Sequence, residues 1–387
     1  MAFQHVVFVF VGLLLANGAG ATPIESATSS YPQPTTFWSN ASSLPVAASF
    51  GMPCVHEGLR VVVFPFWTSS SHSRFAAFSA DTGAFLWELS FKETPPSVPG
   101  QYCTASRFLP QFYLGGGAAL YVVYGESGLL ASELPFPPTN AAGPLILTLT
   151  QDATTLFVTA GGGVCALSLP ELDQRYCVGH KVYQHIDSTD SGTFFYNSVN
   201  PADNRTGLVV AAIRDGSTLW RTYANSDSIV GTQSLVAVAS YNVNPNIVTI
   251  YAASTGRKLW TTTAFYDYDI GGGVFVGVYP SNMSNPASVD WIVEAREMAT
   301  GERLWQTTVR KTSSPTVTGS GHVFAHGSSN GGFLTAVNLL SGNVAWQFHP
   351  PAGTTGTCIV GNGVAFQNQY IFGMGGCTAA GFFSVRI

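Results

Sequence analysis

Two histidines in this sequence have the spacing of a metal-binding pair. His322 and His326 are four residues apart, as zinc ligands on one face of a helix would be. The residues around them alternate in the manner of a strand, however, and a rise of ~3.3 Å per residue would place the two rings about 13 Å apart. That separation is too large for a shared metal ion, so we interpret both residues as strand histidines.

Two carboxylates form the second candidate site. Asp267 and Asp269 alternate within an acidic and aromatic stretch and would lie on one face of a strand. Such a pair could bind calcium or act as an acid and a base. No third ligand can be located in the sequence, and stretches of this kind also serve as structural caps. We therefore interpret the pair as structural and keep the calcium or acid–base site as the alternative.

Other residues of catalytic type lack the partners that their chemistry needs. Two histidine–carboxylate pairs stand without a nucleophile motif beside them: His56 with Glu57, and His185 with Asp187. Three glycine triplets precede no helical pattern and are interpreted as turns at strand ends: 115–117, 161–163 and 271–273. The sequence thus predicts no catalytic, cofactor-binding or metal-binding residue.

A repeated segment determines the elements around these residues. Ala295–Trp305 has the pattern Ala-x-polar-x-x-Thr-Gly-x-x-x-Trp, which recurs closely in Ala77–Trp87 and Ala336–Trp346. The residues before Thr-Gly are typical of a strand, and the polar residue and Gly suit a tight reversal. A second strand then carries the Trp. Each copy is therefore predicted to be a β-hairpin with one large aromatic residue at a fixed place.

The interval between copies predicts the architecture. Trp220 precedes Trp260 by 40 residues, Trp305 follows 45 later and Trp346 another 41 later. Tyr176 takes the place of Trp in a decayed copy 44 residues before Trp220. A period of roughly 40–45 residues built from about four strands is the length of a propeller blade. The sequence therefore predicts an all-β propeller.

The number of blades follows from the phase of the aromatic residues. From Trp87 to Tyr176 is 89 residues, or two periods, so one unmarked blade is expected around Leu129–Leu134. Trp38 lies nearly in phase, and the last strand-like segment, 381–387, has no Thr-Gly turn after it. We therefore predict eight blades, with an N-terminal strand completing the last one. Seven is the alternative if the segment near Leu129 is an insertion.

The repeat resembles the tryptophan-docking motif of propellers of the pyrroloquinoline-quinone type, which occur in quinoprotein alcohol dehydrogenases and in the assembly lipoprotein BamB. Ser313–Asn338 resembles a whole blade of that kind, and the resemblance extends over about residues 35–387. Those dehydrogenases hold their cofactor with a vicinal cysteine pair, a calcium bound by Glu and Asn, and a catalytic Asp. This sequence has no adjacent cysteines, and none of those residues can be matched by position. The resemblance therefore implies the fold without quinone binding.

The N-terminal segment is predicted to direct secretion. The apolar run Val6–Ala16 is followed by the small residues Ala19-Gly20-Ala21, so we assign 1–21 to a signal peptide, 22–34 to a flexible leader and 35–387 to one propeller domain. The alternative, a membrane anchor, would need roughly 20 apolar residues. Three glycosylation sequons are present, and the last two lie in loop-like stretches: Asn40, Asn204 and Asn282.

The six cysteines suit an oxidising compartment, because their number is even and they follow a signal peptide. Cys165 and Cys177 flank the Tyr176 hairpin on opposite strands, so a cross-strand disulfide is predicted there. For the other four cysteines we favour two pairs, with exchange between them left open: Cys54 with Cys103, and Cys358 with Cys377.

These features predict a secreted, disulfide-stabilised, non-catalytic propeller. As the resemblance to BamB implies, it would bind a protein or another extracellular ligand through loops on one face. We expect a monomer with no cofactor and no membrane span, and the net charge of −5 argues against a nucleic-acid partner. The alternative is an enzyme with its site at the propeller channel, either a quinoprotein-type oxidoreductase or an extracellular hydrolase.

Overall fold

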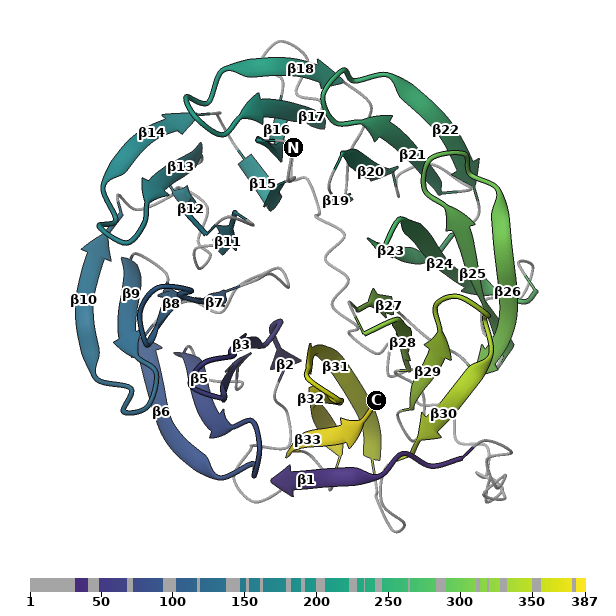
Figure 1. Ribbon diagram of the computed structural model, residues 1–387, viewed down its shortest axis with the longest axis horizontal. Coiled ribbons are helices and arrows are strands. Elements are labelled where there is room, and N and C mark those ends of the chain that lie inside the picture. The colour runs from purple at the N-terminus through teal and green to yellow at the C-terminus, as the bar shows by residue number, and fades with distance from the viewer. Residues whose placement is uncertain are drawn as a thin grey trace, which may run out of the picture.

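The fold is a closed ring of β-sheets (Figure 1). The computed structural model describes these residues, a few of them by backbone alone: 32–40, 49–67, 72–92, 102–116, 119–136, 147–150, 153–160, 163–178, 182–188, 192–199, 206–222, 228–232, 234–240, 246–263, 265–282, 290–310, 314–318, 320–327, 333–349, 356–377 and 381–387. Within these ranges every helix or strand assigned is a β-strand.

Eight antiparallel sheets form the ring. In seven of them the strands run in chain order from the centre outwards, and in the eighth the N-terminal strand takes the outermost place. The prediction of an eight-bladed propeller is therefore confirmed. The seven-bladed alternative is wrong, because the segment near Leu129 belongs to the outer strand of a complete four-stranded sheet. We number the sheets as blades 1 to 8.

The first four blades have the following strands. Blade 1 contains β2 (Ser49–Phe50), β3 (Cys54–His56), β4 (Val61–Trp67), β5 (His72–Ser79) and β6 (Phe85–Lys92). Blade 2 contains β7 (Cys103–Ala105), β8 (Gln111–Gly115), β9 (Ala119–Tyr124) and β10 (Leu130–Pro135). Blade 3 contains β11 (Leu147–Leu149), β12 (Thr155–Ala160), β13 (Gly163–Ser168) and β14 (Gln174–Val178). Blade 4 contains β15 (Val182–Ser188), β16 (Thr193–Val199), β17 (Thr206–Ala212) and β18 (Thr218–Thr222).

The other four blades continue the ring. Blade 5 contains β19 (Ser228–Thr232), β20 (Leu235–Ser240), β21 (Ile247–Ala252) and β22 (Lys258–Thr263). Blade 6 contains β23 (Asp267–Gly271), β24 (Val274–Pro280), β25 (Asp290–Glu297) and β26 (Arg303–Arg310). Blade 7 contains β27 (Ser314–Val317), β28 (His322–His326), β29 (Leu334–Asn338) and β30 (Val344–Phe348). Blade 8 contains β31 (Gly356–Phe366), β32 (Gln369–Cys377), β33 (Gly381–Arg386) and β1 (Thr36–Asn40).

The two ends of the chain close the ring in blade 8. As the sequence predicted, the N-terminal strand β1 completes the last blade by pairing antiparallel with β33 (Figure 1). This pairing places Trp38 opposite Ser384. The segment just before β1 reaches back to blade 7, where the Pro32 carbonyl accepts a hydrogen bond of 3.0 Å from the Gln347 amide. Closure therefore leaves β33 paired on both of its edges, which removes an unprotected edge from the ring.

Aromatic rings from the outer strands join neighbouring blades. Each ring lies against a glycine in the outer turn of the next blade, and a Cβ on that glycine would come within 2.5–2.8 Å of the ring. Only glycine fits this place without displacing the ring. The six pairs are Trp38 with Gly83, Trp87 with Gly128, Tyr176 with Gly216, Trp220 with Gly256, Trp260 with Gly301, and Trp305 with Gly342.

Each of these rings also makes a hydrogen bond. The five indole N–H groups donate over 2.5–2.9 Å to the carbonyl of the residue three before the glycine. The Tyr176 hydroxyl donates to the equivalent carbonyl, that of Ile213. Tyr176 is thus confirmed in the place of a tryptophan. The ring buries apolar area and satisfies its polar atom in one contact.

The boundary between blades 2 and 3 lacks this contact. The register of β10 with β9 puts Ser132 where the aromatic residue stands in the other blades. In blade 3, the place of the glycine is taken by Leu172, whose φ is 64°. A leucine Cβ would clash with an indole there, so the two replacements fit each other. They explain why the sequence shows an unmarked blade at this point.

The boundary between blades 7 and 8 also differs. Trp346 is buried, yet its Nε1 finds no hydrogen-bond acceptor within the described part of the chain. The covalent turn that supplies the acceptor elsewhere does not exist in blade 8, because β1 comes from the opposite end of the sequence. Packing against the Phe324 ring and its neighbours holds Trp346 in place.

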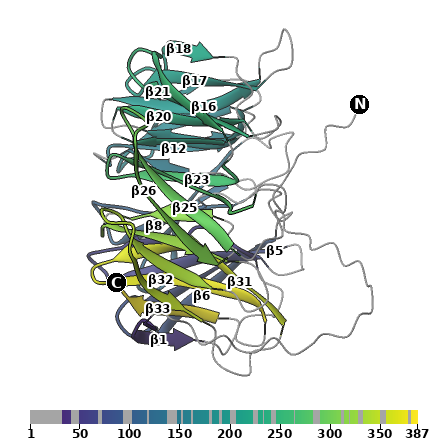
Figure 2. The ribbon, with the colours of Figure 1, turned by 90° about the vertical axis from the view of Figure 1, so that its right-hand side faces the viewer.

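The described turns between first and second strands, and between third and fourth strands, gather at one end of the blades. In blade 2 the Gly125 amide of one such turn donates to the Pro110 carbonyl of the other. Figure 2 shows the turns of this kind along the left side of the molecule. We call this side the turn face.

Gly301→Ala is expected to destabilise the propeller far more than Gly273→Ala. Both glycines have φ of 77°, but a Cβ at residue 301 would lie 2.7 Å from the Trp260 ring, whereas nothing lies within 4 Å at residue 273. Placing alanine in the left-handed backbone conformation costs both variants about 1–2 kcal/mol. Displacing the Trp260 ring costs Gly301→Ala about 1–3 kcal/mol more. Urea unfolding followed by tryptophan fluorescence measures both variants. Equal losses would contradict the docking account.

Ser132→Trp alone is expected to lower the unfolding free energy. The loss caused by Ser132→Trp should be smaller in a protein that also carries Leu172→Gly. The leucine Cβ blocks the docking place, and its removal gives the new indole the same cavity that the other blades provide. We expect a coupling free energy of about 1–3 kcal/mol between the two substitutions. A thermal or urea double-mutant cycle measures it, and strict additivity would show that the two positions do not form one contact.

Candidate functional site

The two predicted carboxylates lie on the innermost strand of blade 6. Asp267 and Asp269 are both half-buried on β23. One carboxylate oxygen of Asp269 accepts from the Ile270 amide at 2.8 Å, and the other accepts from the Val317 amide of blade 7 at 2.7 Å. Asp267 accepts from the next amide, that of Tyr268, at 2.8 Å. Asp269 therefore fastens two blades together, which is a structural role.

No metal-binding group accompanies these carboxylates in the described ranges. Among those residues, no three His, Cys, Asp or Glu side chains come close enough together to hold an ion.

The two strand histidines lie at opposite ends of β28, as predicted. His322 is half-buried and its Nδ1 lies 3.2 Å from the Ser320 carbonyl. His326 is buried, and its Nε2 lies 3.1 Å from the Thr316 hydroxyl and 3.2 Å from the Tyr370 hydroxyl. Burial raises the pKa of Tyr370, so the phenol stays neutral. This polar cluster bridges blades 7 and 8 through neutral hydroxyl groups and an imidazole.

In the third candidate pair, His56 makes structural hydrogen bonds and Glu57 is exposed. The His56 Nε2 lies 2.9 Å from the Leu109 carbonyl, and its Nδ1 accepts from the Leu59 amide at 3.2 Å. The first of these bonds joins blade 1 to blade 2, and the second holds the ring within its own turn. The backbone of β15 is described, but its side chains, those of His185 and Asp187 included, lie outside the description.

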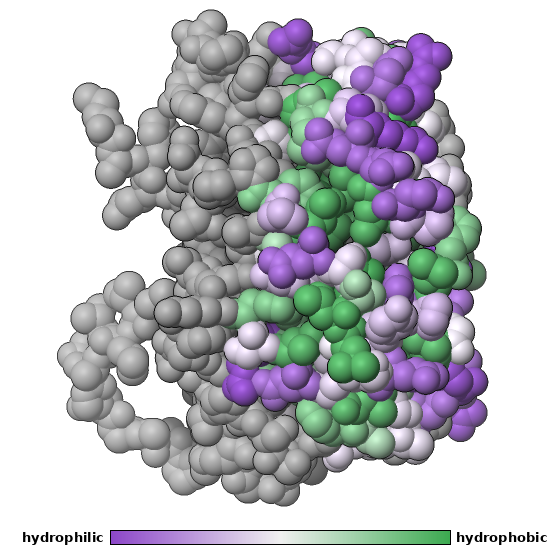
Figure 3. Space-filling model, turned by 90° about the vertical axis from the view of Figure 1, so that its left-hand side faces the viewer, coloured by the Kyte–Doolittle hydropathy of each residue, from purple (hydrophilic) through white to green (hydrophobic). Residues whose placement is uncertain are grey.

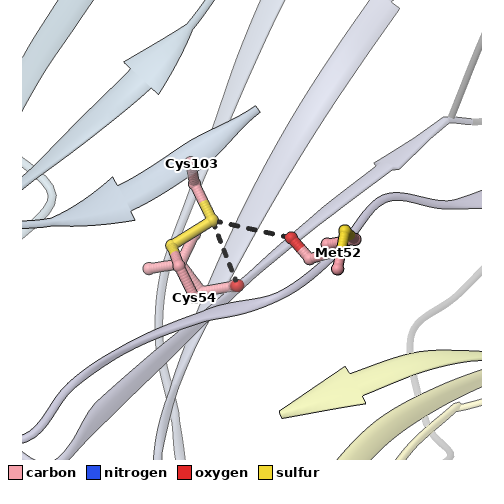
Figure 4. The surroundings of a disulfide bond; sticks show 4 residues. Met52, Cys54 and Cys103 are labelled. Atoms are coloured by element: carbon pink, nitrogen blue, oxygen red, sulfur yellow. Dashed lines mark hydrogen bonds between the residues drawn. A yellow bond between two sulfur atoms is a disulfide. The ribbon is translucent and has the colours of Figure 1, made fainter. Parts of the chain in front are cut away.

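Two disulfides confirm the predicted pairs within the described side chains. Cys54 and Cys103 join the inner strands β3 and β7, so this bond links blades 1 and 2. Figure 4 shows the disulfide with Met52 beside it. The Cys103 sulfur lies 3.8 Å from the carbonyl oxygens of Met52 and Val63. These are close contacts, since a disulfide sulfur has no proton to donate.

The other cysteines lie in blades 3 and 8. Cys165 and Cys177 are directly opposite on β13 and β14 and form the second disulfide. The side chains of Cys358 and Cys377 lie outside the description, although their strands β31 and β32 pair with each other.

An apolar surface on blades 1 and 2 is the one feature that sequence reasoning did not find. Eleven large apolar side chains are exposed among the described residues, and eight of them belong to these two blades. In Figure 3, where β10 faces the viewer, apolar side chains adjoin one another across the rim. We call the five that belong to blade 2 the blade 2 patch: Phe108, Leu109, Tyr124, Leu129 and Leu130.

The blade 2 patch is carried by hydrogen-bonded turns. The Ser106 hydroxyl accepts from the amides of Phe108 and Leu109, at 3.2 and 3.1 Å. The Tyr124 amide donates to the Leu129 carbonyl at 2.9 Å in the next turn. Leu129 is 68% exposed, although a leucine is a poor choice for a solvated turn. The successive apolar residues Phe108-Leu109 and Leu129-Leu130 are the sequence signal that could have revealed the surface.

Comparison with known protein families supports the repeat found in the sequence. A family model described as outer membrane protein assembly factor BamB matches residues 244–371, which carry the docking aromatic residues of blades 5, 6 and 7. The match supports a propeller repeat of the pyrroloquinoline-quinone-like type, as the sequence predicted. No curated protein matches its sequence.

Solved structures share the fold of this propeller. The C-terminal WD40 domain of Sif2 is 9% identical with a TM-score of 0.63, covering 92% of this chain and 99% of that one. Sqt1 of Saccharomyces cerevisiae is 12% identical with a TM-score of 0.63, covering 92% and 100%. A europium-containing methanol dehydrogenase is 10% identical with a TM-score of 0.58, covering 88% and 85%. Identities this low show the fold alone.

The remaining sequence predictions concern the surface and the N-terminus. Asn282 is exposed just after β24, while the Asn40 side chain and Asn204 lie outside the described residues, as do 1–31. The described ranges contain no helix with the length and apolar character needed to cross a bilayer.

Asp269→Ala is expected to lower the unfolding free energy by about 1–3 kcal/mol, because it leaves a half-buried inter-blade amide without its charged acceptor. Asp267→Ala is measured alongside it as the second carboxylate of the pair. Urea unfolding with and without millimolar calcium tests the assignment. A calcium-dependent rise in stability that either substitution abolishes would establish the metal site instead.

Proposed function

We propose that this chain is a secreted, non-catalytic propeller that binds another protein through the turn face and rim of blades 1 and 2. The exposed apolar surface is the observation that carries this proposal. Contiguous apolar surface is costly in water and marks places where a protein meets a partner. Its concentration on two of eight blades argues against random exposure.

The scaffold suits a binding role. Blades 1 and 2 are joined by the Cys54–Cys103 disulfide, by the Trp87 docking contact and by the His56 bond to the Leu109 carbonyl. A surface held in this way loses little conformational entropy when a partner binds, which favours affinity. The four turns of these two blades therefore present a nearly rigid platform.

Secretion is supported by the chemistry of the cysteines. Two disulfides between described residues fit an oxidising, non-cytoplasmic compartment. The apolar leader of 1–21 and the sequons at Asn204 and Asn282 are consistent with export and glycosylation. We propose that the domain, residues 35–387, acts as a monomer that contributes one binding face.

Replacing Phe108 and Leu129 by Asp is expected to abolish capture of a partner by the purified, tagged protein in native extracellular medium. The two charges make the blade 2 patch too polar to be desolvated. Leu340→Asp is the matched control, because Leu340 is 87% exposed on a turn of blade 7. Quantitative mass spectrometry compares the three captures.

Two outcomes would overturn the proposal. One is a partner set that is the same for the patch variant and for the wild-type protein. The other is turnover of an alcohol or an extracellular polymer by the protein supplied with pyrroloquinoline quinone and calcium, which would establish the enzyme alternative.

A further inference from the structure

We propose that the outer edge of β10 binds an extended, basic and apolar segment of the partner, which pairs with β10 as a fifth strand of blade 2. This inference rests on the proposed protein-binding function and names the chemistry of the partner. Strand addition provides main-chain hydrogen bonds for affinity, and alternate side chains then provide specificity.

β10 is the most open outer strand of the propeller. It ends its sheet, and five of its six residues are exposed, with only Leu134 half-buried. Among the eight outer strands, all of which are described, β10 alone has neither an aromatic residue nor a Lys or Arg. Lysine and arginine are common protection against strand pairing at a sheet edge. The only residues of β10 that could discourage strand pairing at its edge are Glu133 and the terminal Pro135.

The molecule already uses an outer edge in this way. In blade 7, the Gln347 amide of the outer strand β30 donates to the carbonyl of Pro32. Pro32 belongs to the extended segment that leads into β1, so an extended segment lies along the outer edge of a blade. The outer edge of β10 has the same place in its own blade, and nothing described in the chain covers it.

The charges around β10 favour a basic partner. Glu126 and Glu133 are exposed, and neither forms an ion pair within the described part of the chain. In blade 1, by contrast, Asp81 pairs with Arg60 and Glu88 pairs with Arg74. The two carboxylates of blade 2, which have no ion pair among the described residues, lie in the same turn and strand as Leu129 and Leu130 and would attract a segment in which basic and apolar residues alternate.

The test uses two capped octapeptides with the intact protein, one alternating lysine and valine and the other alternating glutamate and valine. Binding is measured by fluorescence anisotropy at low and physiological salt, and hydrogen exchange locates the protected amides. We expect saturable binding of the lysine peptide, weaker binding at higher salt, and at least 10-fold greater protection of amides in β10. Glu133→Lys should weaken binding at least 10-fold, whereas the control Glu302→Lys in blade 6 should not.

Equal binding of the two peptides, protection outside blade 2 or no saturable binding would overturn strand addition. These results are distinguishable from failure of the proposed function. If the Phe108 and Leu129 variant still loses its partner in capture, protein binding stands and occurs through the turns alone. If that variant also keeps its partner, the binding function itself is wrong.

Discussion

The architecture depends on an aromatic ring that lies where a glycine has no side chain. Six blade boundaries use this contact, and in each the ring also donates a hydrogen bond to a carbonyl three residues before the glycine. The ring fixes the distance between two sheets and the bond fixes its rotation. Because the contact repeats around the circle, it sets the common inclination of the blades and allows the ring to close.

The two remaining boundaries show which parts of this contact can be replaced. Between blades 2 and 3, Ser132 stands in place of the aromatic residue and Leu172 stands in place of the glycine. The Leu172 side chain packs against the core between the blades. At blades 7 and 8, Trp346 keeps its packing but has no acceptor in the described residues. The strand that lacks the aromatic residue, β10, also lacks Lys and Arg, and it begins at the exposed Leu130. A structural deviation and a candidate binding surface thus occur in the same blade.

Much of the fold could be predicted because the docking residues recur at nearly constant intervals. The spacing located blade 2 even though Ser132 replaces the docking aromatic residue there. It also predicted correctly that Tyr176 takes the place of a tryptophan. The cross-strand position of Cys165 and Cys177 followed from the same hairpin. The role of Asp269 could not be predicted, since the amide that it accepts from lies 48 residues away on another blade. The blade 2 patch was missed because periodicity does not tell which ends of the strands meet solvent.

Exchange of the indole N–H protons, followed by NMR of protein labelled with ¹⁵N-tryptophan, tests the docking contact most directly. The account predicts that the indole protons of Trp38, Trp87, Trp220, Trp260 and Trp305 exchange only through global unfolding, with one common free energy. Exchange of these protons at the rate of a solvent-exposed indole, in the folded protein, would contradict it.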